Sequence, residues 1–372
     1  MPGDARCTAC LNASMRVPET PDDITAEWIA QALRAGGAVD PPPIVGLRRQ
    51  VIGNEKGFLS QTLRIELDYA SPAAAGTPTS MVAKIEPERG AFRDAERGSK
   101  AFDREIRFYR EVAGRVPMRV PRIYYAEVSD DGKVLLMEDL CSYEAVDQLH
   151  GLRHAQVIAT AQQAAKLHAT FWNDPSLAGF EWLPLHDHFF EDGFAEHWPA
   201  FAASYELRIG REAVALGERV ARNLRWLEQR IADRPVTLVH GDLRADNLLF
   251  GCDPAHDEVV VLDWQLTTRS LGAIDLARLL GGSEPAAERR GHQLEVFAAW
   301  HEGLLAAGLT DYKIADALAD FRLGVLYCLF IPVKGFALAG PEPGGRTGRL
   351  LDAIAERLYA SALELDAGAV LP

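Results

Sequence analysis

The most informative stretch of the chain reads Leu238-Val239-His240-Gly241-Asp242-Leu243-Arg244-Ala245-Asp246-Asn247-Leu248-Leu249-Phe250, followed by Val259-Val260-Val261-Leu262-Asp263-Trp264-Gln265. Two apolar strands bracket a polar loop, which supplies Asp242 and Asn247, and the second strand ends in Asp263. Such a set suits phosphoryl transfer, in which one carboxylate orients the attacking hydroxyl while an amide and another carboxylate hold Mg²⁺. The alternative is that these residues only cap turns and end a strand. We disfavour it because spacing and chemistry agree at several positions.

Upstream of this stretch, the sequence predicts a five-stranded sheet with helices. Alternation of apolar and polar residues predicts strands over 44–52, 59–69, 81–86, 123–128 and 134–137, and apolar spacings of three or four predict helices over 22–35 and 101–114. The strand lysine Lys84 needs a compensating charge, and Glu105, beside the apolar stripe of the second helix, can provide it. A solvated ion pair without function is the alternative.

Downstream of residue 140 the chain changes to long helical runs, such as 155–172, 211–231 and from 294 onward, interrupted by a strand-rich patch at 237–266. The apolar window 323–333 is about half the roughly 20 residues that a membrane span needs, so we expect one buried helix there. We predict three parts: a disordered leader over 1–20, an N-terminal lobe over 21–139 and a C-terminal lobe over 140–372.

Composition narrows the classes of partner. With 39 basic and 53 acidic residues the formal net charge is −14, which argues against nucleic acid and is compatible with cationic small molecules. The 5 cysteines are irregularly spaced and do not form a disulfide framework, so we expect a reducing cytoplasm. Cys7 and Cys10 form a lone C-x-x-C, which we assign to the leader. No secretory signal, membrane anchor or obligate protein partner is indicated.

Several motifs resemble the kinase-like small-molecule phosphotransferases, which include aminoglycoside phosphotransferases and choline kinases. The chain is most similar to their ecdysteroid kinase-like (CHK-type) branch, from about residue 28 to residue 358. The motifs that carry the resemblance are His240-Gly241-Asp242 with Asn247, Leu262-Asp263-Trp264-Gln265-Leu266, Ile274-Asp275-Leu276-Ala277, Gly57-Phe58-Leu59-Ser60, Met137-Glu138-Asp139-Leu140 and Lys166-Leu167-His168-Ala169. The resemblance implies an α+β, bilobal protein-kinase-like fold with a five-stranded antiparallel N-lobe and a mainly helical C-lobe.

The resemblance also implies a role for each site residue. Asp242 is expected to be the catalytic base or to position the hydroxyl, and Asn247 and Asp263 to be the Mg²⁺ ligands. Lys84 is expected to bind the ATP phosphates and to pair with Glu105. The remaining nucleotide contacts fall on a turn that includes Gly57 and Ser60, and on the backbone of the segment linking the lobes, from Glu138 to Leu140.

Other residues near the catalytic and metal-binding residues are expected to have supporting roles. Arg244 either stabilises charge on the transferred phosphate or is a surface arginine, and the sequence favours neither. We expect His240 to brace the loop and Asp275 to tether its backbone amides. A cluster that includes His186, His188 and His197 is interpreted as surface decoration or as a wall of the acceptor pocket, with a metal site disfavoured. The neighbouring aromatic residues are expected to serve mainly as core.

The predicted reaction moves the γ-phosphoryl group of ATP to a hydroxyl of a small organic acceptor. The branch favours a steroid-like or other apolar alcohol, whereas the acidic charge favours an amino alcohol or aminoglycoside. We rank the apolar alcohol slightly higher. A nucleotide-binding regulatory protein without catalysis is the alternative function. A protein kinase is disfavoured because only 12 residues separate Asp263 from Asp275, and no A-P-E segment is found.

Overall fold

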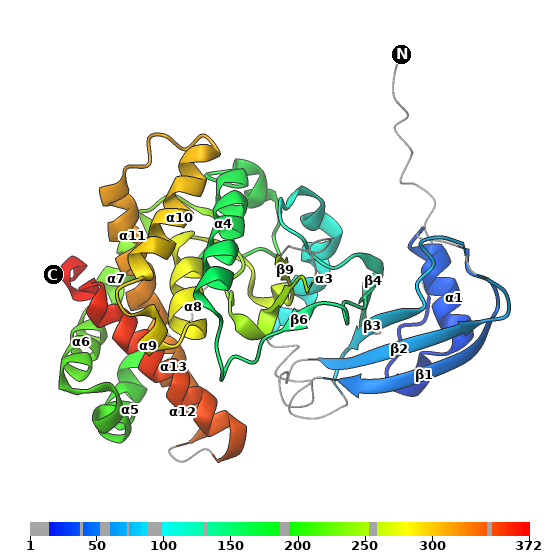
Figure 1. Cartoon of the computed structure of the whole chain (residues 1–372), viewed down its shortest axis with the longest axis horizontal. Helices are drawn as coiled ribbons and strands as arrows, with labels where there is room; N and C mark the ends of the chain where they lie inside the picture. Colours follow the sequence, from blue (N-terminus) through cyan, green and yellow to red (C-terminus); the bar gives the residue numbers. More distant parts are fainter. Residues whose placement is uncertain are drawn as a thin grey trace. The chain divides into compact units, whose positions relative to one another are not determined.

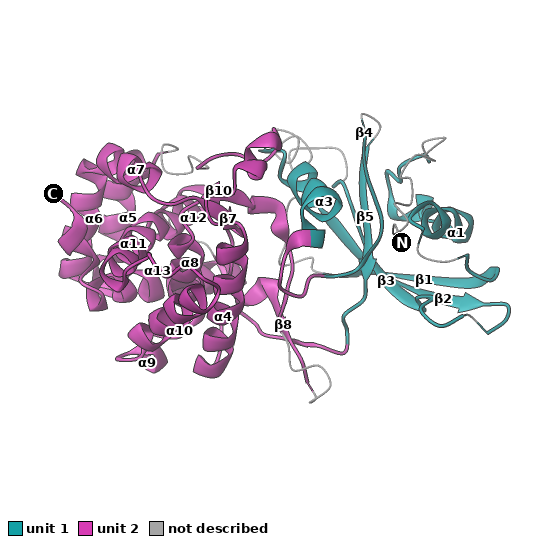
Figure 2. Ribbon diagram, turned by 90° about the horizontal axis from the view of Figure 1, so that it is seen from above, with its two compact units in different colours: residues 1–114, 121–141 teal, residues 115–120, 142–372 magenta. Residues whose placement is uncertain are grey.

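The computed structural model describes residues 15–37, 40–52, 60–72, 74–87, 99–129, 132–186, 193–252, 259–340 and 344–372. Most of the predicted leader, Gly57 and residues 187–192 of the histidine cluster lie outside the described residues. The chain divides into two compact units, which Figure 2 colours separately. The first comprises residues 1–114 and 121–141, and the second comprises residues 115–120 and 142–372.

The first unit is built on a five-stranded antiparallel sheet with strand order β1-β2-β3-β5-β4. Its elements are η1 (Pro21–Asp23), α1 (Ala26–Ala35), β1 (Ile44–Ile52), β2 (Gln61–Tyr69), β3 (Ser80–Ile85), α3 (Ala101–Glu111), η2 (Ala113–Arg115), β4 (Ile123–Ser129) and β5 (Gly132–Glu138). All five predicted strands are confirmed, with ends that shift by up to two residues. The helix predicted over 101–114 ends at Glu111, and the one predicted over 22–35 begins later, at Ala26.

The two faces of this sheet have different partners. Alternate side chains of β2 and β3, among them Ile65 and Ala83, are fully buried in a core that includes Trp28 and Ile29 of α1. Since neighbouring side chains on a strand point to opposite faces, Lys84 points away from this core, and it meets Glu105 of α3. The strand period therefore places the lysine on the face that α3 covers.

The second unit is mainly helical (Figure 1). Its helices are α4 (His154–Thr170), η3 (Pro175–Gly179), α5 (Phe194–Ile209), α6 (Arg211–Arg222), α7 (Leu224–Ala232), η4 (Ala245–Asn247), η6 (Trp264–Leu266), α8 (Ala273–Ser283), α9 (Ala286–Arg289), α10 (Gln293–Ala306), α11 (Ile314–Cys328), α12 (Phe330–Ala339), α13 (Gly345–Glu364) and η7 (Ala367–Val370). The α+β fold class predicted from the sequence is thus confirmed: a five-stranded antiparallel sheet in the first unit and a mainly helical second unit.

Two helical predictions were wrong in detail. The run 211–231 is two helices that break at Asn223, and the window 323–333 spans the end of α11 and the start of α12. Pro332 has no backbone N–H to donate to the carbonyl of Cys328, so a continuous helix would lose that hydrogen bond. Among the described helices, none is long and apolar enough to cross a membrane.

Short strands of the second unit position the polar loop. They are β6 (Glu144–Ala145), β7 (Thr237–Val239), β8 (Leu248–Phe250), β9 (Val259–Val261) and β10 (Thr268–Ser270), and they pair as β10-β7 and as β6-β8-β9. The loop from His240 to Asn247 connects β7 to β8, and Asp263 follows β9. Of these, β7, β8 and β9 are almost completely buried, and β7 and β8 fix the two ends of the loop.

Three of the aromatic residues of the insert are buried in the core, as predicted for most of the set. Phe194, Trp198 and Tyr205 are buried on α5, where Trp198 and Tyr205 pack against the ring of Phe201. The ring of Phe201 also lies against Tyr359 of α13. These side chains attach α5 to the rest of the helical unit.

Candidate active site

The backbone of the polar loop is held by one buried carboxylate. Asp275 of α8 accepts hydrogen bonds from the backbone N–H groups of His240, at 2.7 Å, and Gly241, at 2.9 Å. Gly241 has φ +82°, and a Cβ there would lie 2.2 Å from the carbonyl oxygen of Leu266. The position therefore requires glycine. The tether predicted for Asp275 is confirmed.

A fixed histidine supports this aspartate in turn. Trp300 donates its indole N–H to Nδ1 of His168, at 2.9 Å, and a tryptophan can only donate. The proton of the neutral His168 ring is therefore on Nε2, 3.3 Å from Asp275 Oδ2. All three side chains are buried, so the loop is anchored to the interior of the helical unit.

Replacing Asp275 by asparagine is expected to lower the free energy of unfolding by about 2–3 kcal/mol, because an amide cannot accept from both loop N–H groups with its two terminal atoms. Urea unfolding followed by circular dichroism measures this loss. The exposed Asp311→Asn on the same unit is the matched control and should change stability little. Equal stability of the two variants would show that the tether does not contribute.

His240 braces the loop, as predicted. The backbone N–H of Asp242 donates to His240 Nδ1, at 3.2 Å, so the ring proton lies on Nε2 and is donated to the carbonyl oxygen of Leu262, at 2.8 Å. The ring also packs against Trp264, with centroids 4.7 Å apart. His240 thus links the loop to the strand end that carries Asp263.

Asp242 is almost completely engaged by positive and polar groups. Its Oδ1 accepts two hydrogen bonds from Arg278 of α8, at 3.0 and 2.7 Å, and its Oδ2 accepts one from Arg244, at 2.9 Å, and one from Asn247, at 3.0 Å. Four bonds fill the four lone-pair positions of a carboxylate. Burial opposes ionisation of Asp242, but the charges of Arg244 and Arg278 outweigh it and hold the pKa of Asp242 well below its ordinary value.

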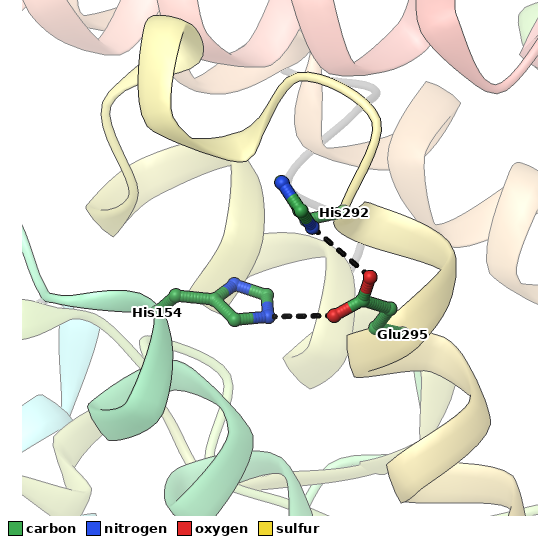
Figure 3. Close-up of side chains that lie close together, drawn as sticks. All are labelled: His154, His292 and Glu295. Carbon is green, nitrogen blue, oxygen red and sulfur yellow. Dashed lines mark hydrogen bonds and ion pairs between the residues drawn. The ribbon is translucent and has the colours of Figure 1, made fainter.

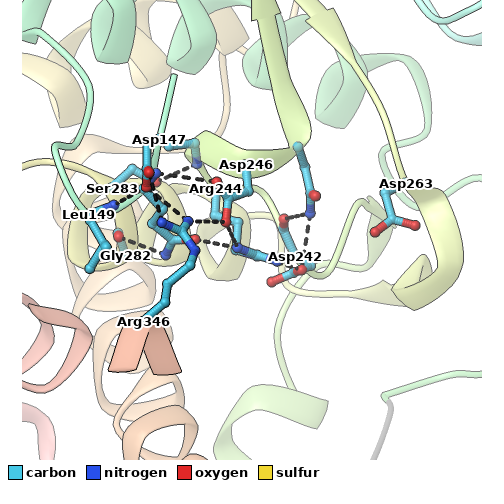
Figure 4. A network of polar contacts seen from close by, with 12 residues as sticks. Asp147, Leu149, Asp242, Arg244, Asp246, Asp263, Gly282, Ser283 and Arg346 are labelled. Atoms are coloured by element: carbon cyan, nitrogen blue, oxygen red, sulfur yellow. Dashed lines mark hydrogen bonds and ion pairs between the residues drawn. The ribbon is translucent and has the colours of Figure 1, made fainter. Parts of the chain in front are cut away.

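Arg244 is held in place on both sides (Figure 4). Besides Asp242, its guanidinium donates to Gln148 and to Asp246, the latter at 2.9 Å. Gln148 and Asp246 are themselves joined by a hydrogen bond from the backbone N–H of Gln148, at 3.2 Å. Burial opposes the charge on Arg244, but the surrounding carboxylates raise the pKa of Arg244. The surface-arginine alternative is therefore wrong.

A further arginine extends this network. Arg346 of α13 forms two hydrogen bonds to Asp147, at 2.7 and 2.9 Å, and lies 3.8 Å from Asp246 (Figure 4). The network fixes the segment around Gln148 to the helical unit, so the contact between Gln148 and Arg244 has a rigid support.

Asn247 and Asp263 fit a hard cation by their chemistry and position. The backbone N–H of Leu262 donates to the carbonyl oxygen of Asn247, at 2.9 Å, so the two residues stand at neighbouring ends of β8 and β9. The amide nitrogen of Asn247 donates to the backbone and to the side chain of Asp242, which leaves the amide oxygen for a cation. Asp263 has φ 62°, a strained value for a residue other than glycine and one that recurs at functional sites. Carboxylate and amide oxygens are the ligands that Mg²⁺ prefers.

In the first unit, the predicted Lys84–Glu105 pair is present. Lys84 Nζ lies 2.7 and 2.9 Å from the two carboxylate oxygens of Glu105, and the side chains are 15% and 2% exposed. Ser60 directly precedes β2, and Gly57 lies outside the described residues. Glu138 ends β5 and accepts from the backbone N–H of Arg122, and Leu140 is buried.

A cavity of about 300 Å³ opens beside the loop in the second unit. Its lining is mostly apolar, with Asp242, Arg278 and Lys334 as its charged residues, and it comprises Val239, Gly241, Asp242, Leu266, Thr268, Ser270, Ile274, Arg278, Tyr327, Cys328, Phe330, Ile331, Lys334, Gly335 and Leu338. His186 and His197 are not among them; His186 instead contacts Ser270 Oγ through Nδ1, at 3.2 Å. The described histidines of the predicted cluster are therefore not the wall of this cavity.

Sequence reasoning missed Arg278 and the wall formed by α11 and α12. Arg278 follows Asp275 by three residues, so both lie on one face of α8, and this spacing could have found it. The wall residues Tyr327 and Ile331 fall in the apolar window that was interpreted as a single buried helix. The break between α11 and α12 lies at that wall.

The sheet with its Lys84–Glu105 pair and the helical unit with its anchored loop define the class of kinase-like phosphotransferases. Residues 72–318 match the phosphotransferase enzyme family, APH, and the chain belongs to this family. It is therefore a phosphotransferase that acts on small molecules. No curated protein matches the chain.

Solved structures support the same fold. A candidate aminoglycoside phosphotransferase from Ralstonia eutropha JMP134 is 18% identical, with 90% of this chain and 98% of that chain covered and a TM-score of 0.52. A microcompartment-associated aminopropanol kinase is 16% identical, with 92% and 99% covered and a TM-score of 0.53. At these identities the likeness is one of fold.

Proposed function

We propose that this phosphotransferase moves the γ-phosphoryl group of ATP to a hydroxyl of an apolar small molecule, a steroid-like or related alcohol as in the ecdysteroid kinase-like branch. The observation that carries the proposal is that Asp242 lines a largely apolar cavity of about 300 Å³. A cavity of that size is within the range of small-ligand pockets, which are commonly apolar with a few polar groups that orient the ligand. We also propose a cytoplasmic location.

The charges of the cavity favour an apolar acceptor over a cationic one. Among the described residues that line it, Asp242 is the single carboxylate, and two arginines already neutralise it. Arg278 and Lys334 add positive charge to the lining. An aminoglycoside or amino alcohol would need carboxylates for its ammonium groups. The chain carries a net charge of −14, but the lining of this cavity is not negatively charged.

Each site residue receives a role in the proposed reaction. Asp242 accepts the hydrogen bond of the acceptor hydroxyl and aims its oxygen at the phosphorus, a task of orientation that a low pKa does not prevent. Asn247 and Asp263 would hold Mg²⁺, which would neutralise charge on the nucleotide phosphates. Lys84, oriented by Glu105, binds phosphate oxygens, and the backbone from Glu138 to Leu140 binds adenine. Gly57 and Ser60 are the further residues that we propose for contacts with the phosphates.

The filled lone pairs of Asp242 require that a partner leave before a hydroxyl can bind. We assign this change to Arg244, whose Nε would exchange Asp242 for a phosphate oxygen. Its Nη1 keeps its bonds to Gln148 and Asp246, so the guanidinium stays beside the loop. Arg278, which makes two bonds to the other oxygen, keeps the carboxylate oriented meanwhile. Binding of nucleotide thus prepares Asp242 for the acceptor.

Nothing among the described residues favours the two alternatives from the sequence. Asp242 and Asn247 are joined by a hydrogen bond, and Asn247 accepts another from Leu262, the residue before Asp263. A regulatory protein without catalysis does not need these three side chains. The residues between Asp263 and α8 form η6 and β10, which leaves no activation loop in this described segment for a protein substrate.

The proposed function is tested by measuring ADP formation with steroids, other apolar alcohols, amino alcohols, sugars and aminoglycosides, with Asp242→Asn as the blank. We expect the apolar alcohols to give the highest kcat/KM. Turnover with aminoglycosides alone would contradict the proposed acceptor while leaving the phosphotransferase assignment intact.

A charged residue in the apolar wall is expected to weaken binding of the acceptor and to leave binding of the nucleotide unchanged. Ile331→Glu should raise KM for the apolar alcohol more than about 10-fold, because it replaces an apolar part of the wall with a charged, hydrated side chain, and should leave KM for ATP unchanged. Leu207→Glu, on the fully exposed surface of α5, is the matched control. Equal KM values for the alcohol in the two variants would place the acceptor elsewhere.

A further inference from the structure

A second polar cluster lies apart from the loop and the cavity. His154 is the first residue of α4, His292 immediately precedes α10, and Glu295 is in the first turn of α10 (Figure 3). One ligand atom from each of the three side chains lies within 4.8 Å of the other two. Such a group is able to surround one cation.

The ring of His154 is oriented by a buried carboxylate. Its Nδ1 lies 2.9 Å from Oε1 of Glu284, a residue that is completely buried at the end of α8. A carboxylate accepts, so the proton of the neutral ring is on Nδ1 and the lone pair is on Nε2. Nε2 faces Oε2 of Glu295 at 3.3 Å, and the two atoms form an ion pair when the ring carries a second proton. With the ring neutral, two lone pairs face each other there, and a cation bound between them takes the place of that proton.

The other two side chains complete the arrangement. His292 Nδ1 lies 3.0 Å from Oε1 of Glu295, and the side chains of His292 and Glu295 are 53% and 59% exposed. The hydrogen bond from His292 is the main cause that keeps the pKa of Glu295 below its ordinary value, so Glu295 is a carboxylate at neutral pH. Figure 3 shows one ring facing each oxygen of this carboxylate. A cation therefore has access from solvent.

We propose that His154, His292 and Glu295 bind one divalent transition metal of the zinc class. Two imidazoles and one carboxylate are a ligand set that Zn²⁺ takes, whereas Mg²⁺ and Ca²⁺ prefer oxygen alone. Zinc–ligand distances of about 2.0–2.2 Å in a tetrahedron separate the ligands by roughly 3.3 Å, and His154 Nε2 and Glu295 Oε2 are 3.3 Å apart. Glu284 supplies the carboxylate behind a ligating histidine that such sites commonly have.

The proposed metal joins α4 to α10 beside the end of α8. That end also supports the polar loop, because Ser283 Oγ accepts from the backbone N–H of Ala245, at 2.9 Å, and the carbonyl oxygen of Gly282 accepts from Gln148, at 2.9 Å. The metal would thus stabilise the part of the helical unit to which the loop is attached. Three protein ligands leave a fourth position for water or an added ligand.

The experiment uses the full chain, freed of metal with a chelator and titrated with Zn²⁺ against a zinc-sensitive indicator in the presence of saturating Mg²⁺. We expect the wild type to bind one equivalent more than His292→Ala and Glu295→Gln. His150→Ala, an exposed histidine outside the cluster, is the matched control and should bind like the wild type. Zn²⁺ should also raise the Tm of the wild type and the control, and not that of the two cluster variants.

Titration with Co²⁺ separates this site from cysteines. Two imidazoles and a carboxylate give visible d–d absorption without the thiolate charge-transfer band that Cys7 and Cys10 would produce. The same zinc stoichiometry and affinity in the wild type and both cluster variants would overturn the proposal. So would the absence of saturable binding to the wild type, which would mean that a proton on His154 separates the two acceptors. Both variants change exposed side chains, and their melting without metal verifies that they fold.

Discussion

Asp242→Asn is expected to reduce kcat by roughly 10³-fold, while the affinity for nucleotide stays close to that of the wild type. The amide keeps the size of the side chain and one oxygen that accepts, but it loses the charge that aligns the acceptor hydroxyl. In the structure that charge is fixed by Arg278 and Arg244, at hydrogen-bond distances of 2.7–3.0 Å. The variant leaves two arginines without a counter-charge, so some loss of stability accompanies the loss of turnover.

Single-turnover phosphorylation of the best acceptor gives the chemical step, and a fluorescent nucleotide analogue gives the affinity. Asp246→Asn is the matched control, because Asp246 also binds Arg244, at 2.9 Å, but does not line the cavity. We expect its turnover to fall far less. Retained turnover in Asp242→Asn, with an intact melting transition, would refute the assignment of Asp242.

Asp263→Ala is expected to lower kcat/KM by roughly 10²–10³-fold, mainly through weaker binding of the magnesium nucleotide. The reason is the oxygen that the variant removes from the proposed cation site at the ends of β8 and β9. Part of the loss should be recovered at high Mg²⁺ concentration, since a weakened site fills when the ion is abundant. Calorimetric titration with a non-hydrolysable nucleotide, at several Mg²⁺ concentrations, measures the effect.

Gln265→Leu is the matched control for this variant, because Gln265 donates to Asp263 Oδ2, at 3.3 Å, without being a proposed ligand. A change of a few-fold at most is expected there. If Asp263→Ala binds the magnesium nucleotide as tightly as the wild type, Asp263 is not a ligand. The two variants are thus distinguished. Asp242→Asn loses turnover while nucleotide binding stays intact, and Asp263→Ala loses binding of the magnesium nucleotide.

Local patterns predicted most of the fold and the loop. The alternation of apolar and polar residues predicted all five strands and the face of the sheet on which Lys84 lies. The three- and four-residue spacing of the next helix predicted that Glu105 lies beside its apolar stripe, where it meets Lys84. The role of Asp275 came from the family resemblance, through the motif Ile274-Asp275-Leu276-Ala277. These features depend on residues that are close together in the sequence, so the sequence alone can predict them.

The residues that were missed depend on contacts between distant segments. Arg278 is 36 positions from Asp242, and Gln148, the partner of Arg244, is 96 positions from that arginine. An isolated arginine in a sequence looks the same whether it is buried or solvated, so the surface alternative for Arg244 could not be excluded. The cavity, too, is lined by residues from segments between β7 and α12, so no local sequence pattern predicts it.

The hydrogen bonds from Arg244 and Arg278 to Asp242 have a consequence for the order in which ligands bind. A water molecule that enters the empty cavity meets a carboxylate whose four lone pairs are already occupied, so it is not activated for attack. By the movement proposed for Arg244, the carboxylate becomes available once nucleotide is bound. Nucleotide is therefore expected to bind before the acceptor, an order that initial-rate and product-inhibition kinetics would reveal.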